Sequence, residues 1–206
     1  WKTWYTGLKN LKNLHFPRAM LRADTDGATV ELHHFCDASE TAYGCAAYVR
    51  VVYPDGDIDV NLLCAKGRVA PISHVTIPRL ELIAAHLTTR LNVSLLDDLT
   101  MKFSAVHFWC DSTITLHYIR NPSLRLQTFV ANRVSYIHQN TEVSQWHHVR
   151  TDLNIADIIS RGIMSVDDLP RQWIKGPDFL HLPEAEWPVE VAVSYTHLRA
   201  HETTEH

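Results

Sequence analysis

The chain has 206 residues, of which 46% are hydrophobic and 20% charged, so it is long enough to bury at least one globular core. Its 19 lysines and arginines against 23 acidic residues give a formal charge of −4. This balance excludes the strongly basic surface that marks many nucleic-acid binders, and any nucleic-acid contact must therefore be local.

The four cysteines lie singly in apolar runs and form no C-x-x-C pair. This usage indicates buried thiols and argues against a disulfide framework or a zinc site. No apolar run approaches the roughly 18 residues that cross a bilayer, and the first residues lack the apolar core of a signal peptide. We therefore expect a soluble, intracellular product with no membrane partner.

Residues 1–30 carry apolar side chains at near-helical spacing and then turn-forming residues, which predicts a helix and a connector. There is no initiator methionine, so we expect this segment to continue from an upstream region. The next residues change to strand-like runs at 31–37, 42–53 and 59–65. The turn sequence P-D-G-D at 54–57 predicts that consecutive strands pair in an antiparallel manner.

A helix is predicted over 77–99, where Pro78 suits the first turn and leucines and alanines form an apolar stripe. The remaining pattern predicts a strand at 105–110, helices at 111–120 and 126–139, a strand at 145–150 and a helix at 154–162 that Gly162 ends. The order βββαβααβα is typical of an α/β domain with a mixed sheet.

The C-terminal quarter has weaker patterns. Residues 164–192 contain four prolines among scattered aromatic and leucine side chains, and we expect an extended arm on the surface. Residues 193–206 show neither an apolar period nor turn chemistry and resemble translated adapter sequence, so we exclude them from the fold. The expected organisation is a connector at 1–30, a domain at 31–163, an arm at 164–192 and a non-native tail at 193–206.

Four acidic residues stand at the ends of strands or in the first turns of helices: Asp37, Glu81, Asp111 and Asp157. Asp37 and Asp111 each close a strand and each follow a cysteine that alternation directs to the opposite face. If these two strands are neighbours, their carboxylates are neighbours too. Magnesium prefers oxygen ligands, and a pair of Mg²⁺ ions needs carboxylates that converge from several elements.

Each acid alone has a simpler interpretation. Asp111 could cap the helix that follows it, and Asn154 with Asp157 could form a cap pair. Glu81 could be a first-turn acid that the helix dipole favours, and Asp37 could only form a turn after its strand. The joint order of all four acids favours a site over four separate caps and turns.

The motifs around these acids resemble the ribonuclease H-like domain of retrotransposon polyproteins, specifically the BEL/Pao class, whose catalogue label carries a peptidase name. The matching motifs include F-C-D-A-S-E-T-A-Y-G (35–44), T-I-P-R-L-E-L-I-A-A (76–85), W-C-D-S-T-I-T-L-H (109–117) and H-V-R-T-D-L-N-I-A-D-I-I-S-R-G (148–162). The resemblance covers residues 1–190 and implies a ribonuclease H-like fold with a mixed five-stranded sheet flanked by helices.

The resemblance also implies an activity, namely hydrolysis of the RNA strand of RNA·DNA hybrids during reverse transcription. Asp37 would bridge two Mg²⁺ ions, which Mn²⁺ could replace, while Glu81 and Asp111 would hold one ion and Asp157 would complete the other. The implied partners are the hybrid and an upstream reverse transcriptase domain, in a cytoplasmic retrotransposon particle. Many cellular ribonucleases H have a mobile histidine just before the last acid, whereas T-D-L-N (151–154) has none.

Candidate substrate contacts are basic or hydroxyl side chains near the expected active edge: Ser39, Lys66, Arg68, Arg79, Ser112 and Arg120. For the four basic residues, the alternative is ordinary solvated surface charge. Gly44 could allow close approach of a substrate backbone, or equally the packing of a helix against the strand.

Two other functions compete with an active nuclease. One is a catalytically inactive domain of the same fold that acts as a spacer in a degenerate polyprotein. The other is an aspartic peptidase, but D-T-D-G (24–27) lacks the D-[ST]-G loop of such enzymes and its hydrophobic flank.

Overall fold

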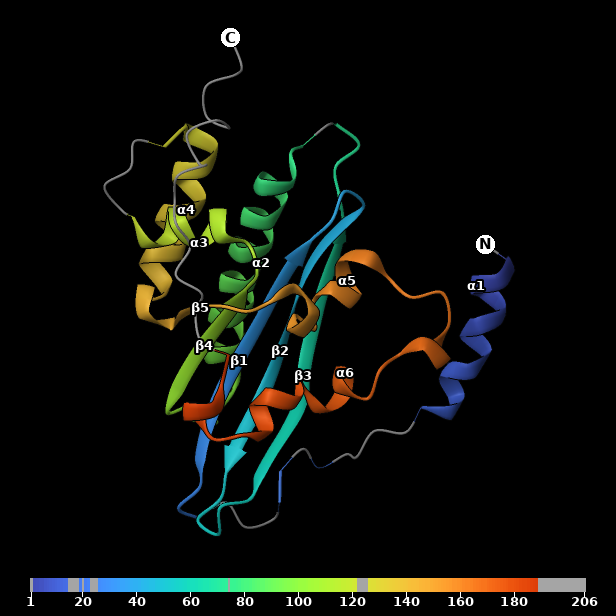
Figure 1. The fold of residues 1–206 in the computed structure, drawn as a ribbon, viewed down its shortest axis with the longest axis vertical. Coiled ribbons are helices and arrows are strands. Elements are labelled where there is room, and N and C mark those ends of the chain that lie inside the picture. Colours follow the sequence, from blue (N-terminus) through green and yellow to red (C-terminus); the bar gives the residue numbers. More distant parts are fainter. Residues whose placement is uncertain are drawn as a thin grey trace.

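The computed structural model of the chain describes residues 2–14, 19, 21–22, 26–73, 75–121 and 126–188, and its centre is one twisted sheet (Figure 1). The strands are β1 (Thr29–Ala38), β2 (Ala42–Val52), β3 (Ile58–Val69), β4 (Ala105–Cys110) and β5 (Trp146–His148). They lie in the order β3-β2-β1-β4-β5. The pairs β1–β2 and β2–β3 are antiparallel, whereas β1–β4 and β4–β5 are parallel. The predicted mixed five-stranded sheet is confirmed.

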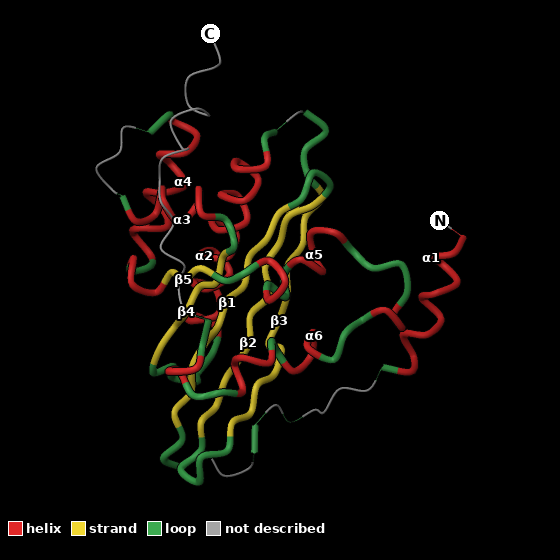
Figure 2. The backbone as a smooth tube through the Cα atoms, in the orientation of Figure 1, coloured by secondary structure: helices red, strands yellow, loops and turns green. Residues whose placement is uncertain are grey.

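Helices cover both faces of this sheet (Figure 2). One face carries α2 (Ile77–Asp98), α3 (Thr113–Arg120) and α4 (Thr128–Asn140), and the other carries α5 (Asp157–Arg161) and α6 (Gln172–Lys175). Strand alternation divides the core accordingly. Leu32 and Cys36 of β1 pack in the cluster that includes α2, whereas Phe35 packs with residues of the C-terminal half.

Single helical turns join these elements. They are η2 (Val143–Gln145), η3 (Thr151–Leu153), η4 (Val166–Asp168), η5 (Asp178–His181) and η6 (Glu184–Glu186), while α1 (Lys2–Gly7) and η1 (Leu8–Asn13) precede the sheet. The helices at the N-terminus stand away from the sheet and lie beside η4 (Figure 1). Asn10 donates a hydrogen bond of 2.7 Å to Asp167 in this contact.

The long helix begins at Ile77, as predicted, but Glu81 is its fifth residue and does not belong to its first turn. Because the dipole effect is confined to the first turn, a dipole does not account for Glu81. The next helix begins at Thr113, with the Ser112 hydroxyl accepting from the Thr115 N–H, so Asp111 is not its cap.

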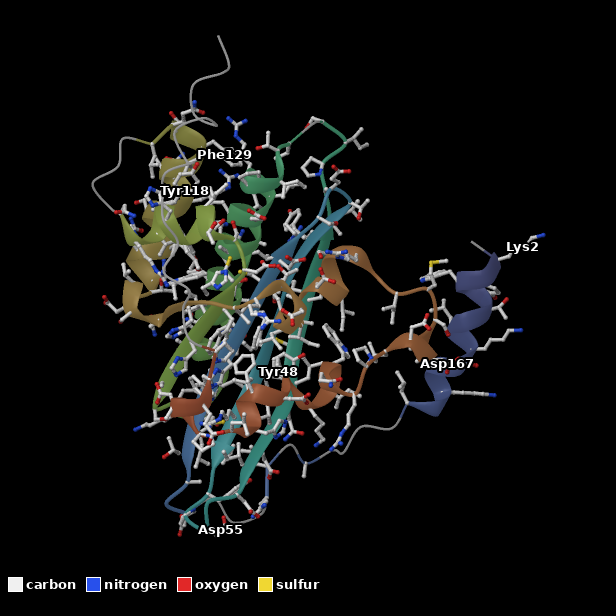
Figure 3. All side chains as sticks on the ribbon, viewed as in Figure 1. Lys2, Tyr48, Asp55, Tyr118, Phe129 and Asp167 are labelled. Carbon is white, nitrogen blue, oxygen red and sulfur yellow. The ribbon has the colours of Figure 1, made fainter. Side chains whose placement is uncertain are left out.

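The C-terminal segment differs most from the expected surface arm. It contains α6, η5 and η6, and Phe179, Leu180 and Trp187 are buried in the second core cluster. The Tyr48 hydroxyl donates to the Trp173 carbonyl at 2.9 Å, and the segment crosses the sheet over Tyr48 (Figure 3). The sequence did not reveal this burial, because helices of one turn are too short to leave an apolar period. Residues 189–192 and the expected non-native tail at 193–206 lie outside the described residues.

The cysteines are free thiols, as the sequence predicted; Cys36, Cys45 and Cys110 are buried and Cys64 is half-buried. Among the described residues, no helix combines the length and the apolar character that a membrane span requires.

Candidate active site

Asp37 and Asp111 lie side by side because β1 and β4 are parallel neighbours. Cys36 is paired with Cys110 across the two strands, so the next residue of each chain segment reaches the same edge of the sheet. Both cysteines point into the core cluster beneath α2. Asp37 therefore points to the opposite face of the sheet, where it is only 8% exposed.

Glu81 reaches this edge from α2, on the face where Cys36 is buried. Ser112 donates a hydrogen bond of 2.5 Å to Glu81 Oε2, and the same hydroxyl accepts from the Thr115 N–H at 3.2 Å. One side chain thus caps α3 and holds a carboxylate of α2.

Asp157 comes from the other face, at the start of α5. The loop before it is fastened to β1, because Asn154 donates to the Cys36 carbonyl at 2.9 Å and accepts from the Ala156 N–H at 3.2 Å. Arg161, one turn later, forms an ion pair of 2.6 Å with Asp157. Asp157 therefore faces the same edge as Asp37.

The four acids line one open pocket with a volume of about 580 Å³. Burial, followed by the negative charges of Asp111 and Asp157, raises the pKa of Asp37 to about 6, although its hydrogen bond from Ser160 acts in the opposite direction. Burial likewise raises the pKa of Glu81 to about 7, and Asp111 and Asp37 add to this effect. The pocket thus concentrates carboxylates whose charges its own residues offset only in part.

Residues 1–112 match the family model of the Pao retrotransposon-like RNaseH-like domain. This match spans more than half of the chain and contains three of the four acids. The chain belongs to this family. No curated protein matches it.

Solved structures similar to this Pao-type domain include ribonucleases H with low sequence identity. The N-terminal RNase H domain of Rv2228c from Mycobacterium tuberculosis is 13% identical, covers 66% of this chain and 94% of its own, and has a TM-score of 0.43. RNase H1 from Halobacterium salinarum is 14% identical, covers 68% and 99%, and has a TM-score of 0.41. LC11-RNase H1, solved in complex with an RNA/DNA hybrid, is 13% identical, covers 68% and 97%, and also has a TM-score of 0.41.

The donor set of the pocket in this Pao-type domain fits divalent cations. All four acids offer oxygen, the ligand type that Mg²⁺ and Mn²⁺ prefer. Burial and then the charges of Asp111 and Asp157 raise the pKa of Asp37, and a divalent cation would offset the repulsion between these carboxylates. The donor set of the pocket therefore suits a hard divalent cation.

The candidate substrate contacts have different surroundings in this Pao-type domain. Ser39 lines the pocket, but its hydroxyl donates to the Ser160 carbonyl at 2.6 Å. The Ser112 proton is engaged by Glu81, and Arg120 donates to the Trp146 carbonyl at 2.9 Å. Lys66 lies in the exposed C-terminal part of β3, outside the pocket lining.

Arg79 on α2 and Arg133 on α4 lie over the same aromatic ring. Arg79 donates to Gln127 at 3.2 Å, with its guanidinium 5.4 Å from the Phe129 ring centroid. Arg133, which the sequence analysis did not single out, stacks on the same ring at 3.5 Å. No described acidic side chain forms an ion pair with either arginine. Arg68, the remaining candidate, is exposed near the end of β3.

The sequence analysis also missed Ser160 and Arg161 on α5. Ser160 donates a short hydrogen bond to Asp37, and Arg161 lines the pocket beside Asp157. Their spacing of three and four residues from Asp157 was the available signal, because such residues share one face of a helix.

A second group of ligand-type side chains lies near the other end of β1. The ligand atoms of Glu31, His33 and His107 are within 4.8 Å of one another. However, Arg50 donates to Glu31 at 2.7 Å and places a fixed positive charge there. Trp109 donates to His33 Nδ1 at 3.2 Å, so neutral His33 carries its proton on the nitrogen that faces Glu31. We interpret this group as a structural network.

Proposed function

We propose that this domain is a metal-dependent endonuclease that hydrolyses the RNA strand of RNA·DNA hybrids during retrotransposon reverse transcription. The observation that carries the proposal is the convergence of Asp37, Glu81, Asp111 and Asp157 on one open pocket. Three of these acids lie within the match to the ribonuclease H-like family. Caps and turns alone would not require four carboxylates from two strand ends and two helices to meet.

The chain would hold two Mg²⁺ ions, with Asp37 contributing to both, Glu81 and Asp111 to one, and Asp157 to the other. When bound, these ions would supply an activated water and stabilise the leaving 3′ oxygen of the cut phosphodiester. Residues of the chain orient these carboxylates. Ser112 donates a hydrogen bond to Glu81, and Arg161 forms an ion pair with Asp157.

Substrate binding would use Arg79, two positions before Glu81 on α2, and Arg133 on α4, whose guanidinium groups form no ion pair with a described acidic side chain. Guanidinium groups bind phosphate oxygens through paired N–H donors. Both guanidinium groups lie over the Phe129 ring, at 5.4 and 3.5 Å from its centroid. Such a pair would contact a nucleic-acid backbone without reading its sequence.

The partners in this proposal are an RNA·DNA hybrid and a reverse transcriptase domain of the same polyprotein, within a cytoplasmic particle. The family description as retrotransposon-like supports this setting. The competing function is a spacer domain without activity. The peptidase alternative is disfavoured because D-T-D-G (24–27) departs from the required D-[ST]-G loop.

Asp37→Asn tests the proposal directly. We expect it to lower Mg²⁺-dependent cleavage of a labelled hybrid by about 10³-fold or more, equivalent to about 4 kcal/mol of barrier. Asp97→Asn is the matched control, because Asp97 is exposed near the far end of α2. Cleavage is followed on gels with Mg²⁺ and with a chelator, and circular dichroism checks the fold.

Full activity of Asp37→Asn, or cleavage that a chelator leaves unchanged, would contradict the proposal. A folded chain that binds Mg²⁺ but does not cut the hybrid would instead support the spacer function.

A further inference from the structure

The hydroxyl of Ser160 is placed against the most buried of the four acids. Ser160 is 1% exposed, and its Oγ donates a short hydrogen bond to Asp37 Oδ2. A hydroxyl has one proton, and the alternative acceptor is the Asp157 carbonyl at 3.1 Å. The carboxylate is the stronger acceptor because it is charged. Ser160 therefore restrains one oxygen of Asp37.

The backbone of Ser160 is fixed as well. Its carbonyl oxygen accepts from Ser39 Oγ at 2.6 Å and from Thr41 Oγ1 at 3.4 Å. Both donors belong to the turn that joins β1 and β2. The last turn of α5 is thus tied to the strand end that carries Asp37.

A pair of glycines allows α5 to come this close to the sheet. Gly44 and Gly67 are opposite each other on β2 and β3, and both lie against Ile159 Cγ2. A Cβ atom on Gly67 would be 2.9 Å from Ile159, and one on Gly44 would collide with Ile159 and lie 2.6 Å from the Lys66 carbonyl oxygen. Gly44 and Gly67 therefore form a side-chain-free surface, the glycine floor, against which Ile159 packs. The next residue, Ser160, reaches Asp37. Of the two roles open to Gly44, the structure supports helix packing.

We propose that Ser160 is a positioning residue that orients Asp37 for metal binding. Its hydrogen bond to Oδ2 restricts rotation of the Asp37 carboxylate and leaves Oδ1 without this contact. Asp37 therefore has less rotational freedom to lose when a cation binds. This inference rests on the proposed function, because it concerns the same carboxylate. It adds a residue whose hydroxyl touches neither substrate nor the reacting atoms.

Ser160→Ala removes the hydroxyl and nothing else. Mutation of a residue that hydrogen-bonds to a metal ligand typically lowers metal affinity by about 10- to 100-fold. We therefore expect the Mg²⁺ dissociation constant of Ser160→Ala to rise by at least about 10-fold. Calorimetric titration of the 206-residue chain with MgCl₂ measures this change without substrate. The Mg²⁺ concentration for half-maximal hybrid cleavage should rise in parallel, whereas the rate at saturating Mg²⁺ should change less.

Two further variants make the test specific. Thr89→Val removes another buried hydroxyl, which donates to the Ala85 carbonyl within α2, and it should leave Mg²⁺ affinity unchanged. Ser160→Cys keeps a weak donor of similar size and should give an intermediate dissociation constant. It also serves as the test variant if Ser160→Ala does not fold by circular dichroism.

The outcomes separate the two proposals. If the unmodified chain binds Mg²⁺ and cuts the hybrid while Ser160→Ala has the same dissociation constant and the same half-maximal concentration, the role of Ser160 is wrong and the nuclease stands. If the unmodified chain neither binds Mg²⁺ nor cuts the hybrid, the nuclease proposal fails and the role of Ser160 fails with it.

Discussion

The two ends of β1 carry carboxylates in opposite electrostatic situations, half-buried Glu31 at one end and buried Asp37 at the other. At one end, Glu31 accepts from Arg50 at 2.7 Å and from His33 at 3.2 Å. Burial alone would raise its pKa, but these two hydrogen bonds lower the pKa of Glu31 to about 2. At the other end, burial and like charges raise the pKa of Asp37 to about 6. Glu31 and Asp37 are six positions apart, and Glu31 is paired with Arg50 whereas Asp37 lies beside other carboxylates.

This contrast separates a structural cluster from a functional one. The network at Glu31 is closed, because Arg50 neutralises it and also donates to the carbonyls of Leu180 and Leu182 at 2.7 and 2.9 Å. The pocket at Asp37 is open and keeps an excess of negative charge. Closed networks stabilise a fold, whereas an unbalanced charge costs stability and is expected where a ligand restores the balance.

Breaking the closed network should have the largest effect on stability. Glu31→Gln leaves the buried Arg50 guanidinium without its counter-charge, and removing one partner of a buried pair costs about 3–5 kcal/mol. Urea unfolding of the metal-free chain at pH 8 measures the loss. Asp37→Asn, the matched change at the other end, should raise stability under the same conditions, and equal losses in both variants would contradict the comparison.

The pH dependence of stability should also differ between the two ends. Because folding raises the pKa of Asp37 to about 6 and that of Glu81 to about 7, the folded state binds more protons than the unfolded state between these values and about 4. Without metal, the free energy of unfolding should therefore fall by several kcal/mol as pH rises from about 4 to about 7. The lowered pKa of Glu31 has the opposite sign, since its stabilisation is lost as pH falls from about 4.5 towards 2.

Urea titrations across this pH range, with and without Mg²⁺, measure the effect. A bound cation favours the ionised carboxylates, so Mg²⁺ should flatten the fall between pH 4 and 7. A metal-free chain whose stability rises over that interval would show that the pocket is not electrostatically unbalanced.

The glycine floor offers a graded change near the open end. In Gly44→Ala the new methyl group would press on the Lys66 backbone as well as on Ile159, whereas in Gly67→Ala it would meet only the Ile159 side chain. We expect Gly44→Ala to cost about 2 kcal/mol and Gly67→Ala about 1 kcal/mol or less, since overpacking typically costs 1–3 kcal/mol. Urea unfolding gives both values, and the reverse order would contradict the proposed seat of α5.

The smallest effects are expected from the two arginines over Phe129. Arg79→Gln and Arg133→Gln should each weaken hybrid binding several-fold and make the slope of log K against log [salt] shallower by about one. Fluorescence anisotropy with a hybrid in Ca²⁺ measures binding without relying on cleavage. Arg150→Gln is the control, because Arg150 is exposed and already paired with Asp152 at 2.7 Å. If this control weakens binding equally, the effect is one of net charge alone.

Much of the fold follows from local patterns in the sequence. Alternation and turn residues placed β1 to β4 and α2 within a few residues, because both are local properties of the chain. The adjacency of Asp37 and Asp111 was conditional, since no local pattern states which strands become parallel neighbours. Ser160 escaped notice because its role depends on Asp37, 123 residues away. The C-terminal segment was misjudged because its buried side chains follow no period.

The clasp between Arg50 and the Leu180 and Leu182 carbonyls defines how short a self-sufficient fragment can be. A polypeptide cut at residue 163 would lose Phe179 and Trp187, which pack edge-on against Trp109, and would leave the Arg50 guanidinium facing water where carbonyls now receive it. Such a fragment would present a broad aromatic surface and would be prone to aggregation. An expressed fragment should therefore extend through residue 188, so that the C-terminal segment still covers the sheet at Arg50 and Trp109.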